Sequence, residues 1–192
     1  DMPHVRCRPP APLPPVTGPH SDPDSLRDCV EEAAQLFNQA GHPVVLAGVE
    51  LLRFGLGSQA LRLVESAEVP FATMLSSKCV LPELHPQFIG IYQGGWSREG
   101  VCQQVESSDC LLSLGVWMTD LDTGLFSFKL DPRRLVAAGG SQVRIHSHYY
   151  HDVQLADFLR ELTGALKPRS YLSSHPTKLD LVKKPFHPED SR

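Results

Sequence analysis

The stretch "PVVLAGVELLRFGLGSQALRLVE", residues 43–65, carries the pattern that decides the fold. Its apolar run Val44–Ala47 is typical of a strand buried on both faces of a parallel sheet. A loop with the charged residues Glu50 and Arg53 follows, and Ser58–Ala67 then repeats apolar residues at helical spacing. In open α/β sheets, ligands usually bind at the loop that leaves such a strand. This loop therefore either binds a ligand or only connects two elements.

Helices and short apolar strands alternate along most of the chain. The first helix is predicted from an Asp22 or Ser25 cap to Gly41. Further strands are predicted over Val69–Leu75, Cys110–Gly115, Arg134–Gly139 and Gln142–Ser147, and further helices over Ser97–Ser107 and, behind an Asp152 cap, Val153–Leu166. This alternation predicts an α/β fold, with a parallel sheet covered by helices on both faces through right-handed crossovers.

The length of 192 residues predicts one domain, large enough to bury a core without disulfides or metals. Residues 1–24 are rich in proline and are predicted to be a linker. Residues 25–166 hold the alternating elements, and the proline-spaced residues 167–192 are predicted to be a linker or tail. A folded core between two linkers is the arrangement expected of a middle domain in a longer chain.

The composition argues against several classes of protein. A net charge of −4 and a pI near 6.1 do not favour nucleic acid as a partner. No apolar run is long enough to span a bilayer, and no signal peptide is visible. The odd number of cysteines, without a Cys-x-x-Cys pair, predicts reduced and mostly buried thiols in a cytoplasmic protein. Because the chain starts at Asp1, we expect a processed form or a piece of something longer.

Two motifs suggest a ligand-binding site, one for a dinucleotide and one for a metal, but neither matches the pattern that such a site requires. Gly55-Leu56-Gly57 hints at a dinucleotide loop, but position 60 is alanine and the preceding strand ends near Gly48, too early for the fingerprint. The favoured interpretation is a turn that opens a helix, whose N-terminus could attract an anion. The histidines of "HSHYYH" suggest a metal, but only Asp152 is a nearby additional ligand, so exposed histidines at a strand end are favoured: His146, His148 and His151.

Polar residues after two other strands are further candidates. Thr119, Asp120 and Asp122 follow a strand, where the acids could bind a cation or a ribose, or cap local turns, which is the favoured role. Cys79 follows another strand beside Lys78, and a neighbouring ammonium lowers the pKa of a thiol, so a reactive or regulatory cysteine is a second hypothesis. The residues alone indicate a binding or scaffold domain without a convincing catalytic set.

Several strings together resemble the middle domain of thiamine-diphosphate-dependent 2-oxo acid decarboxylases, in the pyruvate, indolepyruvate and phenylpyruvate branch. They are "PVVLAGVELLRFGL" (43–56), "HPQFIGIYQG" (85–94), "LLSLGVWMTDLDTG" (111–124) and "HYYHDVQLADFL" (148–159). The resemblance runs from about residue 42 to residue 166. It implies a Rossmann-like three-layer sandwich with a mainly parallel sheet of about six strands.

The resemblance also implies what this chain lacks. In that family the other two domains hold thiamine diphosphate and magnesium, and this sequence contains neither Gly-Asp-Gly nor Asn-Asn. No catalytic, cofactor-binding or metal-binding residue is therefore assigned, and the chain alone is expected to be inactive. Its expected partners are the N- and C-terminal catalytic domains of the same chain, in a protein that is typically a homo-oligomer.

The loop after the first strand is then interpreted as an interface loop. Glu50 and Arg53 would pair with a neighbouring domain and Phe54 would anchor there, with a secondary hypothesis of an effector contact through Glu50, Arg53, Lys78 and Cys79. An exposed aromatic patch that favours self-association is expected from Trp96, Trp117, Phe126 and Phe128. The alternatives are a stand-alone module that binds an FAD- or ADP-type nucleotide or an acyl-CoA, and the central domain of an acetolactate-synthase-like enzyme.

Overall fold

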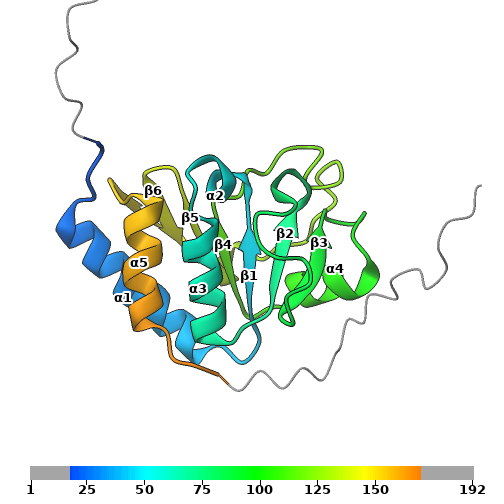
Figure 1. The fold of residues 1–192 in the computed structure, drawn as a ribbon, viewed down its shortest axis with the longest axis horizontal. Helices are drawn as coiled ribbons and strands as arrows, with labels where there is room; N and C mark the ends of the chain where they lie inside the picture. Colours follow the sequence, from blue (N-terminus) through cyan, green and yellow to red (C-terminus); the bar gives the residue numbers. More distant parts are fainter. Residues whose placement is uncertain (1–17, 170–192) are drawn as a thin grey trace, which may run out of the picture.

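The computed structural model describes residues 18–169, and the predictions for residues 1–17 and 170–192 lie outside this range. Its centre is a seven-stranded sheet in the order β3-β2-β1-β4-β5-β6-β7 (Figure 1). The strands are β1 (Pro43–Ala47), β2 (Phe71–Met74), β3 (Phe88–Tyr92), β4 (Cys110–Leu114), β5 (Leu135–Gly139), β6 (Gln142–Ile145) and β7 (His148–His151). The predicted α/β class with a mainly parallel sheet is confirmed, with one strand more than the six expected.

The strands β1 to β5 pair in parallel, whereas β6 and β7 pair antiparallel. Only the residues Gly140 and Ser141 link β5 to β6, and two residues cannot make the crossover that a parallel pair needs. The second hairpin turns at His146, whose φ of 54° is left-handed. The sheet therefore ends in a meander at one edge and in the parallel strand β3 at the other.

Residues 18–169 also form five α-helices and two short 3-10 helices. They are α1 (Pro23–Gln39), α2 (Val49–Arg53), α3 (Gly57–Ala67), η1 (Leu75–Ser77), α4 (Glu99–Glu106), η2 (Pro132–Arg134) and α5 (Leu155–Ala165). None of the helices within residues 18–169 is long and apolar enough to cross a bilayer.

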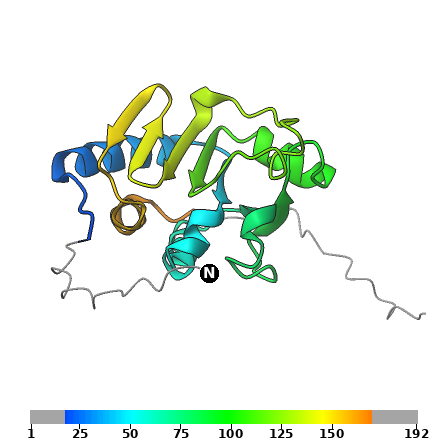
Figure 2. The same ribbon diagram turned by 90° about the horizontal axis from the view of Figure 1, so that it is seen from above.

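The helices divide unequally between the two faces of the sheet. Helices α1, α3 and α5 share one core with the sheet, and α3 and α5 are seen on the same side of it in Figure 2. Within the described residues, α4 alone covers the other face, where its Val101 and Val105 pack on residues of β1 to β4 such as Leu46. The three predicted layers are present, and the third consists of this single helix.

The two predicted helix caps have different outcomes. Asp22 caps α1 as predicted, because its carboxylate accepts a hydrogen bond of 2.8 Å from the amide of Ser25. The Asp152 cap is wrong: α5 begins at Leu155, and Asp152 lies before it with a left-handed φ of 55°. The chain turns at Asp152 to present its carbonyl to the amide of Asp22, at 2.7 Å.

The folded part extends slightly beyond residues 25–166. Ser21 donates to Asp157 at 2.7 Å and accepts from the amide of Gln154 at 2.9 Å, so it holds the start of α5. At the other end, Arg169 donates to the carbonyls of Phe37 and Ala40 at the end of α1. The division of the chain into linker, domain and tail stays a prediction.

Candidate functional site at the carboxyl edge of the sheet

The strand order reverses between β1 and β4, and ligands of open α/β sheets bind outside the carboxyl ends of the strands at such a switch point. Here the chain closes that point itself. A Cβ atom on Gly48, after β1, would lie 2.2 Å from the carbonyl oxygen of Gly115, after β4. The amides of Gly48 and Glu50 donate to the carbonyls of Leu114 and Gly115, at 2.9 and 3.0 Å. These amides are therefore not free to bind a phosphate.

The Glu50 side chain fills the remaining space beside β5. It is 8% exposed, and its two oxygens accept hydrogen bonds from the Trp117 indole at 2.8 Å and from the Gly140 amide at 2.7 Å. A Cβ atom on Gly139 would lie only 2.9 Å from the same carboxylate. The carboxylate thus joins α2 to the loops after β4 and β5. This geometry gives both oxygens of Glu50 partners inside the domain, and its pairing with a neighbouring domain stays a prediction.

Arg53 and Trp117 form a second contact at this edge. The Arg53 guanidinium lies 4.2 Å from the centroid of the Trp117 ring, a cation–π distance. Phe54 next to it is 55% exposed, and Trp117 is 44% exposed although both its indole N–H and one ring face are engaged. The sequence singled out Trp117 only as an exposed aromatic residue and missed its link to Glu50.

The acids after β4 have mainly local partners. Asp122 is 3% exposed. Its carboxylate accepts a hydrogen bond of 2.8 Å from the Ser76 amide and one of 3.3 Å from the Thr119 hydroxyl. Asp120 accepts from the amide of Leu121. These contacts agree with the capping interpretation, and the Asp122–Ser76 bond also ties the loop after β4 to the end of β2. Both oxygens of the buried Asp122 carboxylate thus have hydrogen-bond partners within the chain.

The Gly55-Leu56-Gly57 motif does not follow a strand directly, because helix α2 separates it from β1. Gly57 opens α3, as the favoured interpretation states. A Cβ atom on Gly57 would lie 2.8 Å from the carbonyl oxygen of Val80, so this helix start is covered by the chain. The dinucleotide fingerprint is therefore absent in structure as well as in sequence.

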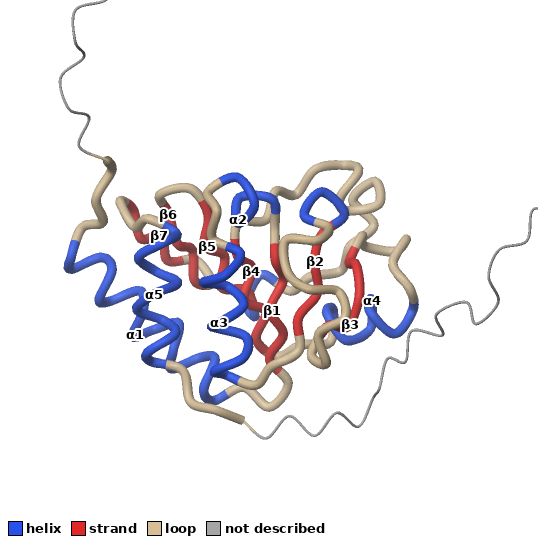
Figure 3. The backbone as a smooth tube through the Cα atoms, viewed as in Figure 1, coloured by secondary structure: helices blue, strands red, loops and turns tan. Residues whose placement is uncertain are grey.

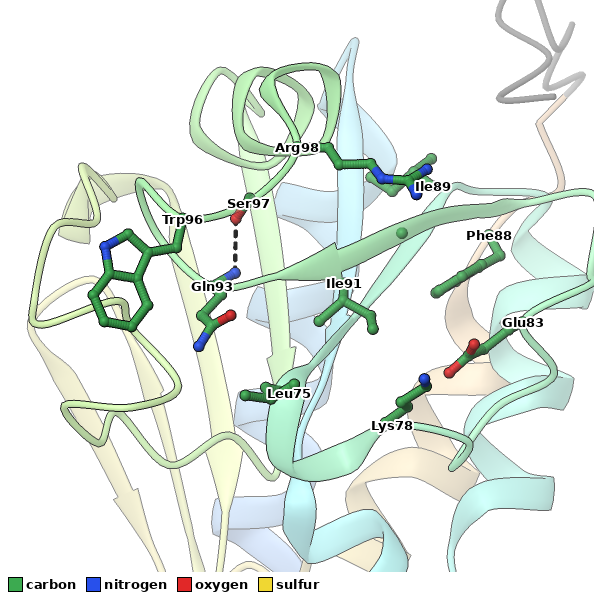
Figure 4. A pocket seen from close by; sticks show the side chains of 11 residues that line it. Leu75, Lys78, Glu83, Phe88, Ile89, Ile91, Gln93, Trp96, Ser97 and Arg98 are labelled. Atoms are coloured by element: carbon green, nitrogen blue, oxygen red, sulfur yellow. Dashed lines mark hydrogen bonds between the residues drawn. The ribbon is translucent and has the colours of Figure 1, made fainter. Parts of the chain in front are cut away.

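A pocket of about 350 Å³ lies along the outer strand β3 (Figure 4). Lys78 lines this pocket, and its ammonium points toward Glu83 in the close-up. Cys79 is exposed with a left-handed φ of 67°, and its sulfur lies 3.7 Å from Glu83. Glu50 lines a different pocket of about 240 Å³ beside β5 and β6. Lys78 and Glu50 thus line two different pockets.

The histidines are also separated by the fold. His146 lies in the turn between β6 and β7, and His148 and His151 lie at opposite ends of β7. His148 contacts Glu32 at 3.4 Å. Residues 18–169 contain no group of three or more histidine, cysteine or acidic side chains that could hold a metal ion.

Comparison with known proteins decides the family. Residues 30–166 match the family described as "Thiamine pyrophosphate enzyme, central domain". The chain belongs to this family. It is 29% identical to the pyruvate decarboxylase of Candida albicans over 147 residues, covering 77% of this chain and 26% of that protein. It is 32% identical to the alpha-keto-acid decarboxylase of Mycobacterium leprae over 171 residues, covering 89% and 30%.

A solved structure supports the fold of this central domain. The benzoylformate decarboxylase of Polynucleobacter necessarius matches with a TM-score of 0.60 at 18% identity, covering 95% of this chain and 35% of that one. The chain thus spans about 26 to 35% of the length of these three proteins. The described residues of the central domain offer no group of three or more histidine, cysteine or acidic side chains that could hold magnesium.

The cysteines of the central domain are expected to differ strongly in reactivity. Burial raises the pKa of Cys29 and Cys110 to about 12, whereas Cys79 is exposed. At about pH 8 the two buried thiols carry almost no thiolate, so we expect Cys79 to react with iodoacetamide at least about a hundredfold faster. Mass spectrometry of the alkylated peptides measures this ratio. Equal rates for Cys79 and Cys110 without denaturant would contradict the described core.

Proposed function

We propose that this chain is the non-catalytic central domain of a thiamine-diphosphate- and magnesium-dependent 2-oxo acid decarboxylase. The parent reaction is the decarboxylation of an aryl or alkyl 2-oxo acid to an aldehyde. Support comes from the family match and from relatives named pyruvate decarboxylase and alpha-keto-acid decarboxylase, of which this chain spans 26% and 30%. In this proposal the chain connects and orients the catalytic domains, and the reacting atoms lie outside it.

The closed switch point is the observation that best supports a scaffold role. The contact between Gly48 and Gly115 and the buried Glu50 carboxylate occupy the place where this fold type would bind a nucleotide. This arrangement favours a scaffold over a stand-alone nucleotide or acyl-CoA module. It also argues against an acetolactate-synthase-like central domain that binds FAD.

The partners in this proposal are the N- and C-terminal catalytic domains of the same protein, which bind thiamine diphosphate and magnesium between them. We further propose that the parent protein is a cytoplasmic homo-oligomer. Arg53 and Phe54 remain candidates for contacts with a neighbouring domain, since both lie at the exposed carboxyl edge. Lys78, which lines the β3 pocket, and the exposed Cys79 next to it in sequence are a separate candidate for an effector contact.

The coding sequence on both sides of this segment tests the proposal most directly. We expect an upstream domain with a cofactor-activating glutamate and a downstream domain with Gly-Asp-Gly and paired asparagines. The 192-residue chain itself should release no aldehyde from phenylpyruvate or indolepyruvate in the presence of thiamine diphosphate and magnesium. Turnover by this chain alone would refute the proposal.

The closed switch point predicts that the purified chain does not bind FAD, ADP or coenzyme A. A ligand that binds only the folded state raises the melting temperature, and at about 1 mM even a weak ligand with a dissociation constant of ~10 μM would add ~2.7 kcal/mol. We therefore expect no saturable rise in a thermal shift assay and no flavin or adenine absorbance in the purified protein. A saturable rise with any of the three would instead support the stand-alone binding module.

A further inference from the structure

Large apolar side chains gather at the carboxyl edge of the sheet. Among the described residues, ten large hydrophobic side chains are exposed, and eight of them lie on loops or on α2 at this one edge. They are Leu52, Phe54, Trp96, Trp117, Met118, Leu121, Leu125 and Phe126, here called the carboxyl-edge face. Figure 3 shows the loops that crowd this upper edge. Scattered exposed hydrophobic residues are ordinary, but such a concentration marks an interaction surface.

Part of this face is held in an unfavourable backbone conformation. Gly124, Leu125 and Phe126 have φ values of 56°, 57° and 59°, so three successive residues are left-handed. A left-handed residue other than glycine costs roughly 1–2 kcal/mol. Leu125 and Phe126 are nevertheless 66% and 61% exposed, so little burial within the described domain offsets this cost. Strain that persists at an exposed site points to a role outside the domain itself.

The same loop is also held rigidly. The amide of Leu125 donates to the carbonyl of Asp120 at 2.7 Å, and the Gln93 side chain donates to the carbonyl of Leu121 at 2.8 Å. Trp96 lines the β3 pocket (Figure 4), and a Cβ atom on Gly124 would lie 3.0 Å from its ring. A surface that is already ordered loses less conformational entropy on binding than a mobile one.

Trp117 is ordered in the same way. Its indole N–H is bonded to Glu50 and one ring face is covered by Arg53, yet 44% of the residue stays accessible. Tryptophan and arginine are the residues most enriched among those that dominate binding energy at protein interfaces. The sequence contains two tryptophans, and both lie on the carboxyl-edge face.

We propose that the carboxyl-edge face is a preformed docking surface for a catalytic domain of the same parent protein, with Trp117, Leu125 and Phe126 as its anchors. This inference rests on the proposed function. A permanent partner fits the apolar character of the face, because obligate interfaces resemble a core cut in half. A central domain that spans 26 to 35% of its relatives also leaves most of such a protein outside this chain. A second copy of the chain is the competing occupant.

Hydroxyl-radical footprinting of the isolated chain and of the intact parent protein tests the occupant residue by residue. We expect modification of Trp117, Leu125 and Phe126 to fall at least about fivefold in the parent, since the core of an interface excludes water. Leu84 and Tyr149 are the internal references; they are 84% and 54% exposed and lie away from this face.

Each outcome of the footprinting supports or overturns a distinct statement. Equal modification of Trp117 and Phe126 in the chain and in an intact, active parent overturns the docking surface and leaves the proposed function standing. Protection that rises with the concentration of the isolated chain, without further protection in the parent, assigns the face to a second copy and overturns the proposed occupant. A coding sequence without flanking catalytic domains overturns both proposals.

The double variant Leu125→Asn/Phe126→Asn separates docking from folding. Asparagine tolerates the left-handed conformation, so the melting temperature of the isolated chain should stay or rise by about 2–4 °C. In the parent, the protection of Trp117 should be lost, whereas the control Leu84→Asn should keep it. Full protection of Trp117 in the double variant, or a melting temperature lowered by more than about 4 °C in the isolated chain, would overturn the role of these anchors.

Discussion

Replacing Gly48 by alanine is expected to destabilise the chain by about 3 kcal/mol or more, a large effect for one methyl group. The new Cβ would lie 2.2 Å from the carbonyl oxygen of Gly115 and 2.3 Å from the Cα atom of Val116. Both are backbone atoms at the end of the central strand β4, so neither can move like a flexible side chain. The strands β1 and β4 would have to separate at the switch point. Urea unfolding followed by circular dichroism measures the loss.

The requirement for glycine at position 48 is steric and not conformational, because its φ of −113° suits any residue. The matched control is Gly164→Ala in α5, where a Cβ atom would meet nothing within 4 Å. Alanine is the better helix former, so this control should stabilise the chain by about 0.5 kcal/mol. If Gly48→Ala and Gly164→Ala had the same small effect, the close contact of β1 with β4 would be wrong.

The elements that the sequence predicts well are those with an uninterrupted apolar pattern. The strands β1 and β4 are buried along their whole length. Their sequences are therefore apolar apart from one buried serine, and each is easily predicted as a strand. Strand β3 was missed because Gly90 divides its apolar run, and its φ of 133° requires glycine there. Strand β7 was missed because it is a polar edge strand from which only Tyr150 packs against the core.

The candidate site was less predictable because its contacts are distant in sequence. Glu50 and Trp117 are 67 residues apart, and Glu50 and Gly140 are 90 apart, so no spacing rule connects them. The short helix α2 was predicted as a loop, since five residues are too few to show a repeating helical pattern. The available signal was the glycine at the end of each neighbouring strand, because such glycines allow backbones to approach closely.

Replacing Glu50 by alanine is the second substitution expected to have a large effect, about 2–3 kcal/mol, because it leaves two partly buried donors without an acceptor. The carboxylate accepts from the Trp117 indole and from the Gly140 amide, and the side chain fills the space between α2 and the loops after β4 and β5. Glu50→Gln keeps the shape but offers one acceptor oxygen in place of two, so about half of that loss is expected.

The control for this second substitution is Glu31→Ala, on the exposed face of α1, which should change stability by less than about 0.5 kcal/mol. Tryptophan fluorescence provides a separate readout, because Glu50→Ala removes the partner of the Trp117 indole and should change its emission, whereas Glu31→Ala should not. If Glu50→Ala left both stability and emission unchanged, the carboxylate would be free to act outside the domain. The interpretation of Glu50 as an interface residue would then gain support.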